Sequence, residues 1–159
     1  MKKLLGLAIL ISLALATPVF AASTRNFRAH LMGGQEVPPA ATLAQGQAVF
    51  QLSKDGTMLH YTLIASNIEN ILQSHIHLAP AGVNGPVVVW LYPSSPPAVL
   101  IPGRFSGVLA EGTITADDLV GPLAGQPLSS LIDEITAGNA YVNVHTSQYP
   151  GGEIRGQIR

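Results

Sequence analysis

Three histidines stand where strand geometry would turn them toward one point. His75 and His77 lie two residues apart in the run Ser74–Leu78, and residues two apart in a strand share a face. His145 belongs to the alternating run Tyr141–Thr146, whose valines are expected to take the core and leave the histidine on the other face. Neutral imidazole has one free lone pair and is a standard ligand for zinc and copper. If these strands pair, the sequence predicts a metal site at His75, His77 and His145.

The same histidines also admit a structural interpretation. Histidines at strand ends often donate hydrogen bonds to loop carbonyls, and a glycine-rich turn at residues 82–86 follows His77 closely. A metal would also need groups that hold its ligands in place, for which the sequence offers Glu36, Asn143 and Glu153. From the residues alone, both interpretations stay open.

The two remaining candidate histidines each lie two residues from a methionine. In His30-Leu31-Met32 and Met58-Leu59-His60, the central leucine belongs to the core-facing alternation, so the flanking residues project from the outer face. Thioether and imidazole ligands together suit Cu(I), which soft sulfur selects. His30, Met32, Met58 and His60 therefore form an alternative copper site, provided that the first and third strands are neighbours.

Short strands are the elements that must position these residues. Glycines and prolines separate runs that alternate apolar and polar residues, which is typical of antiparallel strands with one buried face. The expected strands cover 27–32, 46–52, 57–65, 74–78, 86–92, 104–113, 139–146 and 152–158. The second and third flank the turn 53–56 and predict a hairpin. About eight strands predict a mostly β fold, a Greek-key-like antiparallel sandwich or barrel.

One short amphipathic helix is expected late in the chain. Apolar residues recur at helical spacing between Pro127 and Gly138, which predicts a helix over residues 127–137. Thr115, followed by acidic residues at 117–118, predicts a short capped turn. Neither segment carries a catalytic signal.

The charged residues point away from catalysis. Arg155 is expected to form a structural ion pair with Glu36 or a neighbouring strand rather than to hold a ligand carboxylate. The sequence has no nucleophile elbow, no cysteine and no pair of carboxylates in a credible cleft. These features favour a role that is not enzymatic.

The first 21 residues are typical of a secretory signal. Two lysines precede an apolar run from Leu4 to Ala16, and small residues follow Pro18, so cleavage is expected after Ala21. The apolar run is too short to span a bilayer, so we expect no stable membrane anchor. Residues 22–159 then form one cysteine-free domain of formal net charge −3, which argues against nucleic-acid binding. The expected location is the periplasm or the exterior of the cell.

Six segments occur in order along this domain: FRAHL at 27–31, EVPP at 36–39, HIH at 75–77, NGPVV at 84–88, YVNVHT at 141–146 and GGEIRGQ at 151–157. Together they resemble the CHRD domain, the family named from chordin, from about Phe27 to Ile158. The resemblance implies an extracytoplasmic β-rich domain, as in animal chordins and many bacterial exported proteins, with no established catalytic residues. The histidine strands also resemble, loosely, the copper-binding strands of Cu,Zn superoxide dismutase, another Greek-key β-barrel.

These observations favour an exported, non-enzymatic domain that binds a transition metal, copper in preference to zinc, for storage, delivery or sensing. An alternative is an extracytoplasmic protein-interaction module, with structural histidines and with exposed loops such as Tyr92–Pro97 that hold a partner protein. A third is a copper-dependent redox protein resembling superoxide dismutase. The expected partner is accordingly a metal ion or an extracytoplasmic protein.

Overall fold

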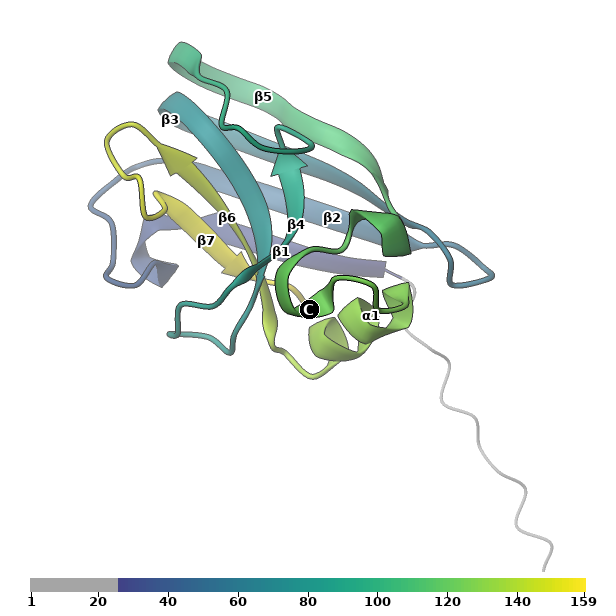
Figure 1. The fold of residues 1–159 in the computed structure, drawn as a ribbon. Coiled ribbons are helices and arrows are strands. Elements are labelled where there is room, and N and C mark those ends of the chain that lie inside the picture. Colours follow the sequence, from purple (N-terminus) through teal and green to yellow (C-terminus); the bar gives the residue numbers. More distant parts are fainter. Residues whose placement is uncertain (1–25) are drawn as a thin grey trace, which may run out of the picture.

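The computed structural model describes residues 26–159, so the expected export signal at residues 1–21 lies outside the described residues. Seven strands and one α-helix make up this part of the chain (Figure 1). In chain order they are β1 (Asn26–Met32), β2 (Gln45–Leu52), β3 (Leu59–Leu78), β4 (Val87–Tyr92), β5 (Ile101–Ile114), α1 (Leu128–Thr136), β6 (Ala140–Thr146) and β7 (Ile154–Gln157). The expected mostly β fold is confirmed. Within residues 26–159, no helix is long and apolar enough to cross a membrane.

Five of the strands close into a barrel. The order β2-β1-β7-β6-β3 is continuous, and β2 also pairs with β3, which completes the circuit. Every pairing is antiparallel. β3 enters the barrel twice, since its first half pairs with β2 and its second half with β6. β5 pairs with the first half of β3 on the edge opposite β2, and β4 pairs with the second half on the edge opposite β6.

The structure has one strand fewer than the sequence predicts, because β3 combines two of the predicted strands. The sequence predicted separate strands at 57–65 and 74–78, whereas the structure has one strand of 20 residues, Leu59–Leu78. The alternation is interrupted at Asn67 and Asn70, whose φ angles are 54° and 53°, and the pairing with β5 shifts register there. Asparagine tolerates this left-handed conformation, and bulges bend a strand without ending it. The two predicted strands are therefore two halves of one bent strand.

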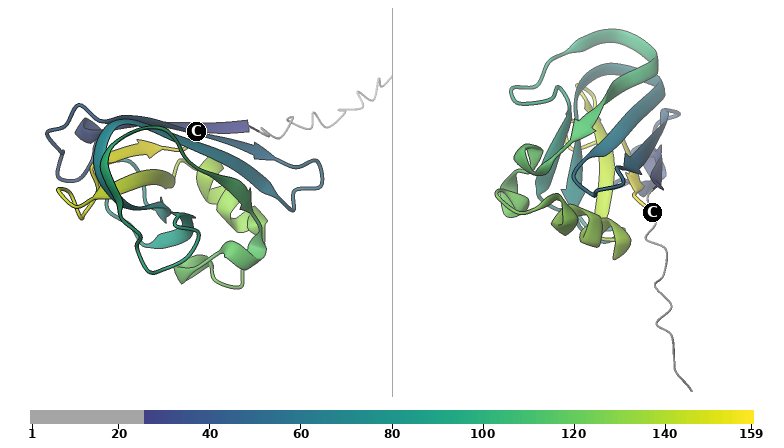
Figure 2. Two further views of the ribbon diagram at one scale, coloured as in Figure 1. Left: turned by 90° about the horizontal axis from the view of Figure 1, so that it is seen from above. Right: turned by 90° about the vertical axis from the view of Figure 1, so that its right-hand side faces the viewer.

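The core lies inside the barrel and beneath α1. In β1 the side chains of Phe27, Ala29 and Leu31 are buried, and the residues between them are exposed, as the alternation predicts. The helix expected over 127–137 is confirmed at Leu128–Thr136, and it buries an apolar face toward the core. Figure 2 shows α1 and the short turns before it at one end of the barrel.

β6 departs from simple alternation because both of its faces are buried. Val142 and Val144 face the core, while Tyr141, Asn143 and His145 belong to the opposite face yet are no more than 6% exposed. Loops cover this outer face, and hydrogen bonds run from side chains of β7 and of residues 147–153 to loop 36–44, left of β6 and β7 in Figure 1, and to loop 79–86, below them. The candidate site lies beneath these loops.

Candidate metal centre

The pairing of β3 with β6 brings the three predicted histidines together. In the register His75 lies opposite Asn143, and His145 lies opposite Gln73, so the histidines occupy adjacent positions on one face. One potential ligand atom from each of His75, His77 and His145 lies within 4.8 Å of the others. All three side chains are buried. The condition that the sequence left open, pairing of these two strands, is met.

Two of the rings are oriented by backbone carbonyl groups. Nδ1 of His77 lies 2.8 Å from the carbonyl oxygen of Gly85, and Nδ1 of His145 lies 2.9 Å from that of Pro150. A carbonyl oxygen can only accept a hydrogen bond, so each Nδ1 carries the proton and donates it. Each Nε2 therefore carries a lone pair, which is the arrangement that carbonyl groups impose on metal-binding histidines.

The third ring, His75, completes the cluster. Its Nδ1 lies 3.2 Å from Nε2 of His145. The ring of Trp90 also meets His75 edge-to-face, with ring centroids 4.3 Å apart. Trp90 is the one tryptophan of the chain. An ion bound by His75 would thus be held by a ring that contacts the protein's only indole.

Burial keeps all three histidines neutral. Burial lowers the pKa of His75 to about 3, helped by the neighbouring His145 and His77. Burial likewise lowers the pKa of His145 to about 4, against the raising effect of its hydrogen bond to Pro150. The pKa of His77 is lowered by burial too, although the Gly85 carbonyl opposes this. Neutral imidazole is the form that binds metal, so no proton must be removed at neutral pH.

One pair of nitrogen atoms has the spacing of metal ligands, and the three potential ligand atoms of the cluster lie within 4.8 Å of one another. Metal–imidazole bonds of about 2.0–2.1 Å at a tetrahedral angle place two ligand nitrogens about 3.3 Å apart, close to the 3.2 Å between His75 and His145. Nε2 of His75 and Nε2 of His77 are buried without a hydrogen-bond partner. A buried polar atom without a partner costs about 1–3 kcal/mol. A metal held by one nitrogen from each ring would give the lone pair of His77 the partner it lacks.

A cation lies behind the cluster. The Tyr141 ring stacks on His77 with centroids 4.9 Å apart, and the Arg155 guanidinium carbon lies 4.1 Å from the Tyr141 ring centroid. Because β6 lies between β3 and β7, Tyr141 separates His77 from Arg155. Nε of Arg155 lies 3.0 Å from the Glu36 carboxylate, which confirms the expected ion pair.

Arg155 and β7 also tie down loop 79–86. Arg155 donates hydrogen bonds to the carbonyl oxygen of Val83, at 3.0 Å, and to the side chain of Asn84. Gln157 donates to the carbonyl oxygen of Ala79 at 2.9 Å. The loop that presents the Gly85 carbonyl to His77 is therefore anchored along its length.

Of the three residues proposed to hold the ligands, Asn143 lies on the histidine face, whereas the two glutamates have other partners. Glu36 pairs with Arg155, and Glu153 accepts hydrogen bonds from the hydroxyl groups of Thr42 and Thr146, both at 2.6 Å. In the described hydrogen bonds neither carboxylate contacts a histidine. The Gly85 and Pro150 carbonyl groups take that role, and only the turn that contains Gly85 was foreseen.

The alternative copper residues are not brought together. β2 lies between β1 and β3, so the strands that carry His30 and His60 are not neighbours. His30 lies opposite Gln47 of β2, and His60 lies opposite Gln51, so the two are also offset by about 13 Å along the strands. Met32 and Met58 are both exposed, and they lie farther apart still, because each is beyond its histidine at the outer end of this offset. His60 instead makes a 2.9 Å hydrogen bond with Thr113.

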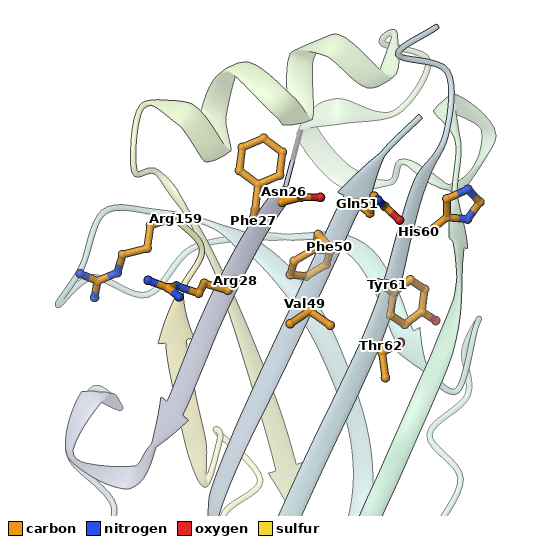
Figure 3. Close-up of a pocket in the computed structure, with 10 residues that line it drawn as sticks. All are labelled: Asn26, Phe27, Arg28, Val49, Phe50, Gln51, His60, Tyr61, Thr62 and Arg159. Carbon is orange, nitrogen blue, oxygen red and sulfur yellow. The ribbon is translucent and has the colours of Figure 1, made fainter. Parts of the chain in front are cut away.

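A surface pocket of about 720 Å³ lies on the outer side of β1, β2 and the start of β3, away from the histidine cluster (Figure 3). Figure 3 shows Arg28 and Arg159 at one end and His60 and Tyr61 at the other. None of the three clustered histidines lines it. The histidine cluster is thus enclosed and separate from this open groove.

The family comparison agrees with the sequence motifs. A family model described as CHRD domain matches residues 27–158, which is nearly the whole of the described chain. Comparisons with curated proteins and with solved structures found no match. All three clustered histidines and both carbonyl groups that orient them lie within the matched region.

Proposed function

We propose that this chain, which belongs to the CHRD domain family, is an exported metal-binding protein that holds one copper ion at His75, His77 and His145 for storage, delivery or sensing. The main observation behind the proposal is that three buried, neutral imidazoles converge, with potential ligand atoms within 4.8 Å of one another. Export is proposed from residues 1–21 of the sequence.

The free nitrogen atoms favour metal binding over a purely structural network. A structural network is stable when its buried polar atoms are hydrogen-bonded. Nδ1 of His77 and Nδ1 of His145 donate to backbone carbonyl groups, but Nε2 of His75 and Nε2 of His77 are buried without partners. The proton of His77 is on Nδ1, so the lone pair on its Nε2 lacks a partner, and a bound metal ion would supply one.

The enclosure favours binding over catalysis. The three histidines are 2%, 8% and 6% exposed, so a substrate has no direct path to an ion that they hold. Storage, delivery and sensing need only that the ion enter and leave. The redox alternative resembling superoxide dismutase would instead require access for a substrate.

Titration of the apo-protein with copper and zinc, under competition with chelators, tests the proposal. We expect one ion per chain with a Kd below about 1 µM. His77→Gln should abolish binding, whereas the exposed pair His30→Gln and His60→Gln should leave it unchanged. Circular dichroism of each variant separates loss of the site from loss of the fold. Absence of any ion bound tighter than micromolar would contradict the proposal.

Exposed apolar residues keep the interaction module as a second candidate. Val99 and Leu100 are about half exposed, directly after the loop Tyr92–Pro97. In that case His77→Gln would lower stability while the wild-type protein bound no metal. The same titration therefore separates the two functions.

A further inference from the structure

We infer that the centre selects Cu(I) over divalent ions and that Asn143 is the residue that sets this preference. The inference rests on the proposed function, because it concerns the oxidation state of the ion that the same three histidines hold. Four features of the site carry it: the charge of the ligands, the charge behind them, their burial and the side chain of Asn143.

No acidic side chain joins the ligand cluster. Among residues 26–159, the cluster contains His75, His77 and His145 alone, and no aspartate or glutamate joins them. Glu36 and Glu153 are the buried acids of the described chain. The first is paired with Arg155 and the second with two threonine hydroxyl groups. The ligands therefore supply no negative charge to a bound ion.

The nearest buried charge that acts on the histidines is positive. Arg155 lies against one face of Tyr141, whose ring stacks on His77. Its guanidinium therefore lies one ring away from His77, and its positive charge disfavours further positive charge at the histidines. A metal ion at the same nitrogens experiences the same repulsion, and a dication experiences it twice as strongly.

Burial further disfavours a dication relative to a monocation. The cost of moving an ion from water into a medium of low dielectric constant rises with the square of its charge, so a dication costs about four times as much as a monocation. Zinc sites built on three histidines are open, and their fourth ligand is a water that ionises near pH 7 and offsets part of this cost. The three imidazoles here are buried, so the site favours the copper ion of lower charge.

Asn143 occupies a position from which a carboxylate could offset the cost of burying a dication. It lies opposite His75 of β3 on one side and opposite Arg155 of β7 on the other, shares the face of the three histidines and is 1% exposed. Its Oδ1 is buried without a hydrogen-bond partner. Aspartate has the same shape as asparagine but adds a negative charge. The neutral amide at this position therefore keeps the whole centre uncharged.

The test measures three affinities and one potential. Cu(I), Cu(II) and Zn(II) are each titrated under chelator competition, with ascorbate present for Cu(I), and the midpoint potential of bound copper is measured with redox mediators. In the wild-type protein we expect Cu(I) to bind at least about tenfold more tightly than Cu(II). Each tenfold difference between the two affinities raises the midpoint potential of bound copper by about 59 mV above that of aqueous copper.

Asn143→Asp should reduce the preference for Cu(I). The new carboxylate should tighten Zn(II) and Cu(II) binding about tenfold or more relative to Cu(I), and it should lower the midpoint potential accordingly. Asn26→Asp, which adds the same charge on the exposed face of β1, is the matched control and should change neither quantity.

Two results would overturn the inference. One is a wild-type protein that binds Cu(II) or Zn(II) as tightly as Cu(I), which decides the matter even if Asn143→Asp fails to fold. The other is a folded Asn143→Asp protein with unchanged relative affinities. Either result leaves metal binding itself standing, whereas failure of all three ions to bind would remove the proposed function as well.

Discussion

Gly85→Ala should weaken both the fold and the metal site through one steric contact. A Cβ at Gly85 would overlap the carbonyl group of Leu78 and would lie 2.9 Å from the Cβ of Ala79. The obstacle is backbone, so it cannot rotate away. The substitution must therefore move the loop that presents the Gly85 carbonyl to His77.

The expected magnitude follows from the two hydrogen bonds that this movement breaks. Gly85 accepts from Nδ1 of His77 at 2.8 Å, and its amide donates to the hydroxyl oxygen of Tyr141 at 3.2 Å. At about 1 kcal/mol each, their loss costs about 2 kcal/mol, and local overpacking adds about 1–3 kcal/mol. Loss of a group that orients a metal ligand typically weakens metal binding by about 10–100-fold.

Urea denaturation of the apo-protein and competitive copper titration measure the two effects. Gly34→Ala is a matched control, because a Cβ there would meet nothing within 4 Å. If Gly85→Ala and Gly34→Ala show the same stability and the same copper affinity, the Gly85 carbonyl does not support His77 as described. A loss of stability with unchanged affinity would refute its role in orienting the metal ligand.

Three further predictions concern charge and light. Because burial lowers the pKa of His75 and His145, the stability of the apo-protein is fully present above about pH 6.5. Below that pH the free energy of unfolding should fall by about 1.4 kcal/mol per pH unit per histidine, down to about pH 4. Urea denaturation at pH 7, 6 and 5 measures this fall, and a flat profile would contradict it. Copper in the cluster should quench Trp90 fluorescence saturably at one equivalent, because the indole contacts His75; unchanged emission at saturation would count against the site. Glu36→Gln should cost about 3–5 kcal/mol, because it leaves Arg155 buried and unpaired, and Glu36→Gln combined with Arg155→Met should recover part of that loss in the same denaturation assay.

The histidine face could be predicted from the sequence because it depends on a local rule. Side chains in a strand alternate with a period of two, so His75 and His77 had to share a face whatever the barrel did. The valines of β6 likewise assigned His145 to the outer face. The Arg155–Glu36 pair was among the outcomes foreseen, because a strand arginine beside acidic residues more often forms a structural ion pair than a ligand site.

Features that depend on strand order could not be predicted in this way. Nothing local to His30 or His60 indicates that β2 lies between their strands, and that placement separates the alternative copper residues. The continuity of β3 was missed because Asn67 and Asn70 resemble a loop and instead form a bend. The Pro150 carbonyl was missed because any residue has a backbone carbonyl group, so its position beside His145 leaves no trace in the sequence.

X-ray absorption spectroscopy of the copper-loaded protein tests the central claim most directly. The histidine cluster predicts a first shell of imidazole nitrogens at about 2.0 Å, with the outer-shell scattering of imidazole rings and no sulfur. The signal should disappear in His77→Gln and persist in Met32→Leu combined with Met58→Leu. A sulfur contribution in the first shell, or a spectrum unaffected by His77→Gln, would contradict a centre built from His75, His77 and His145.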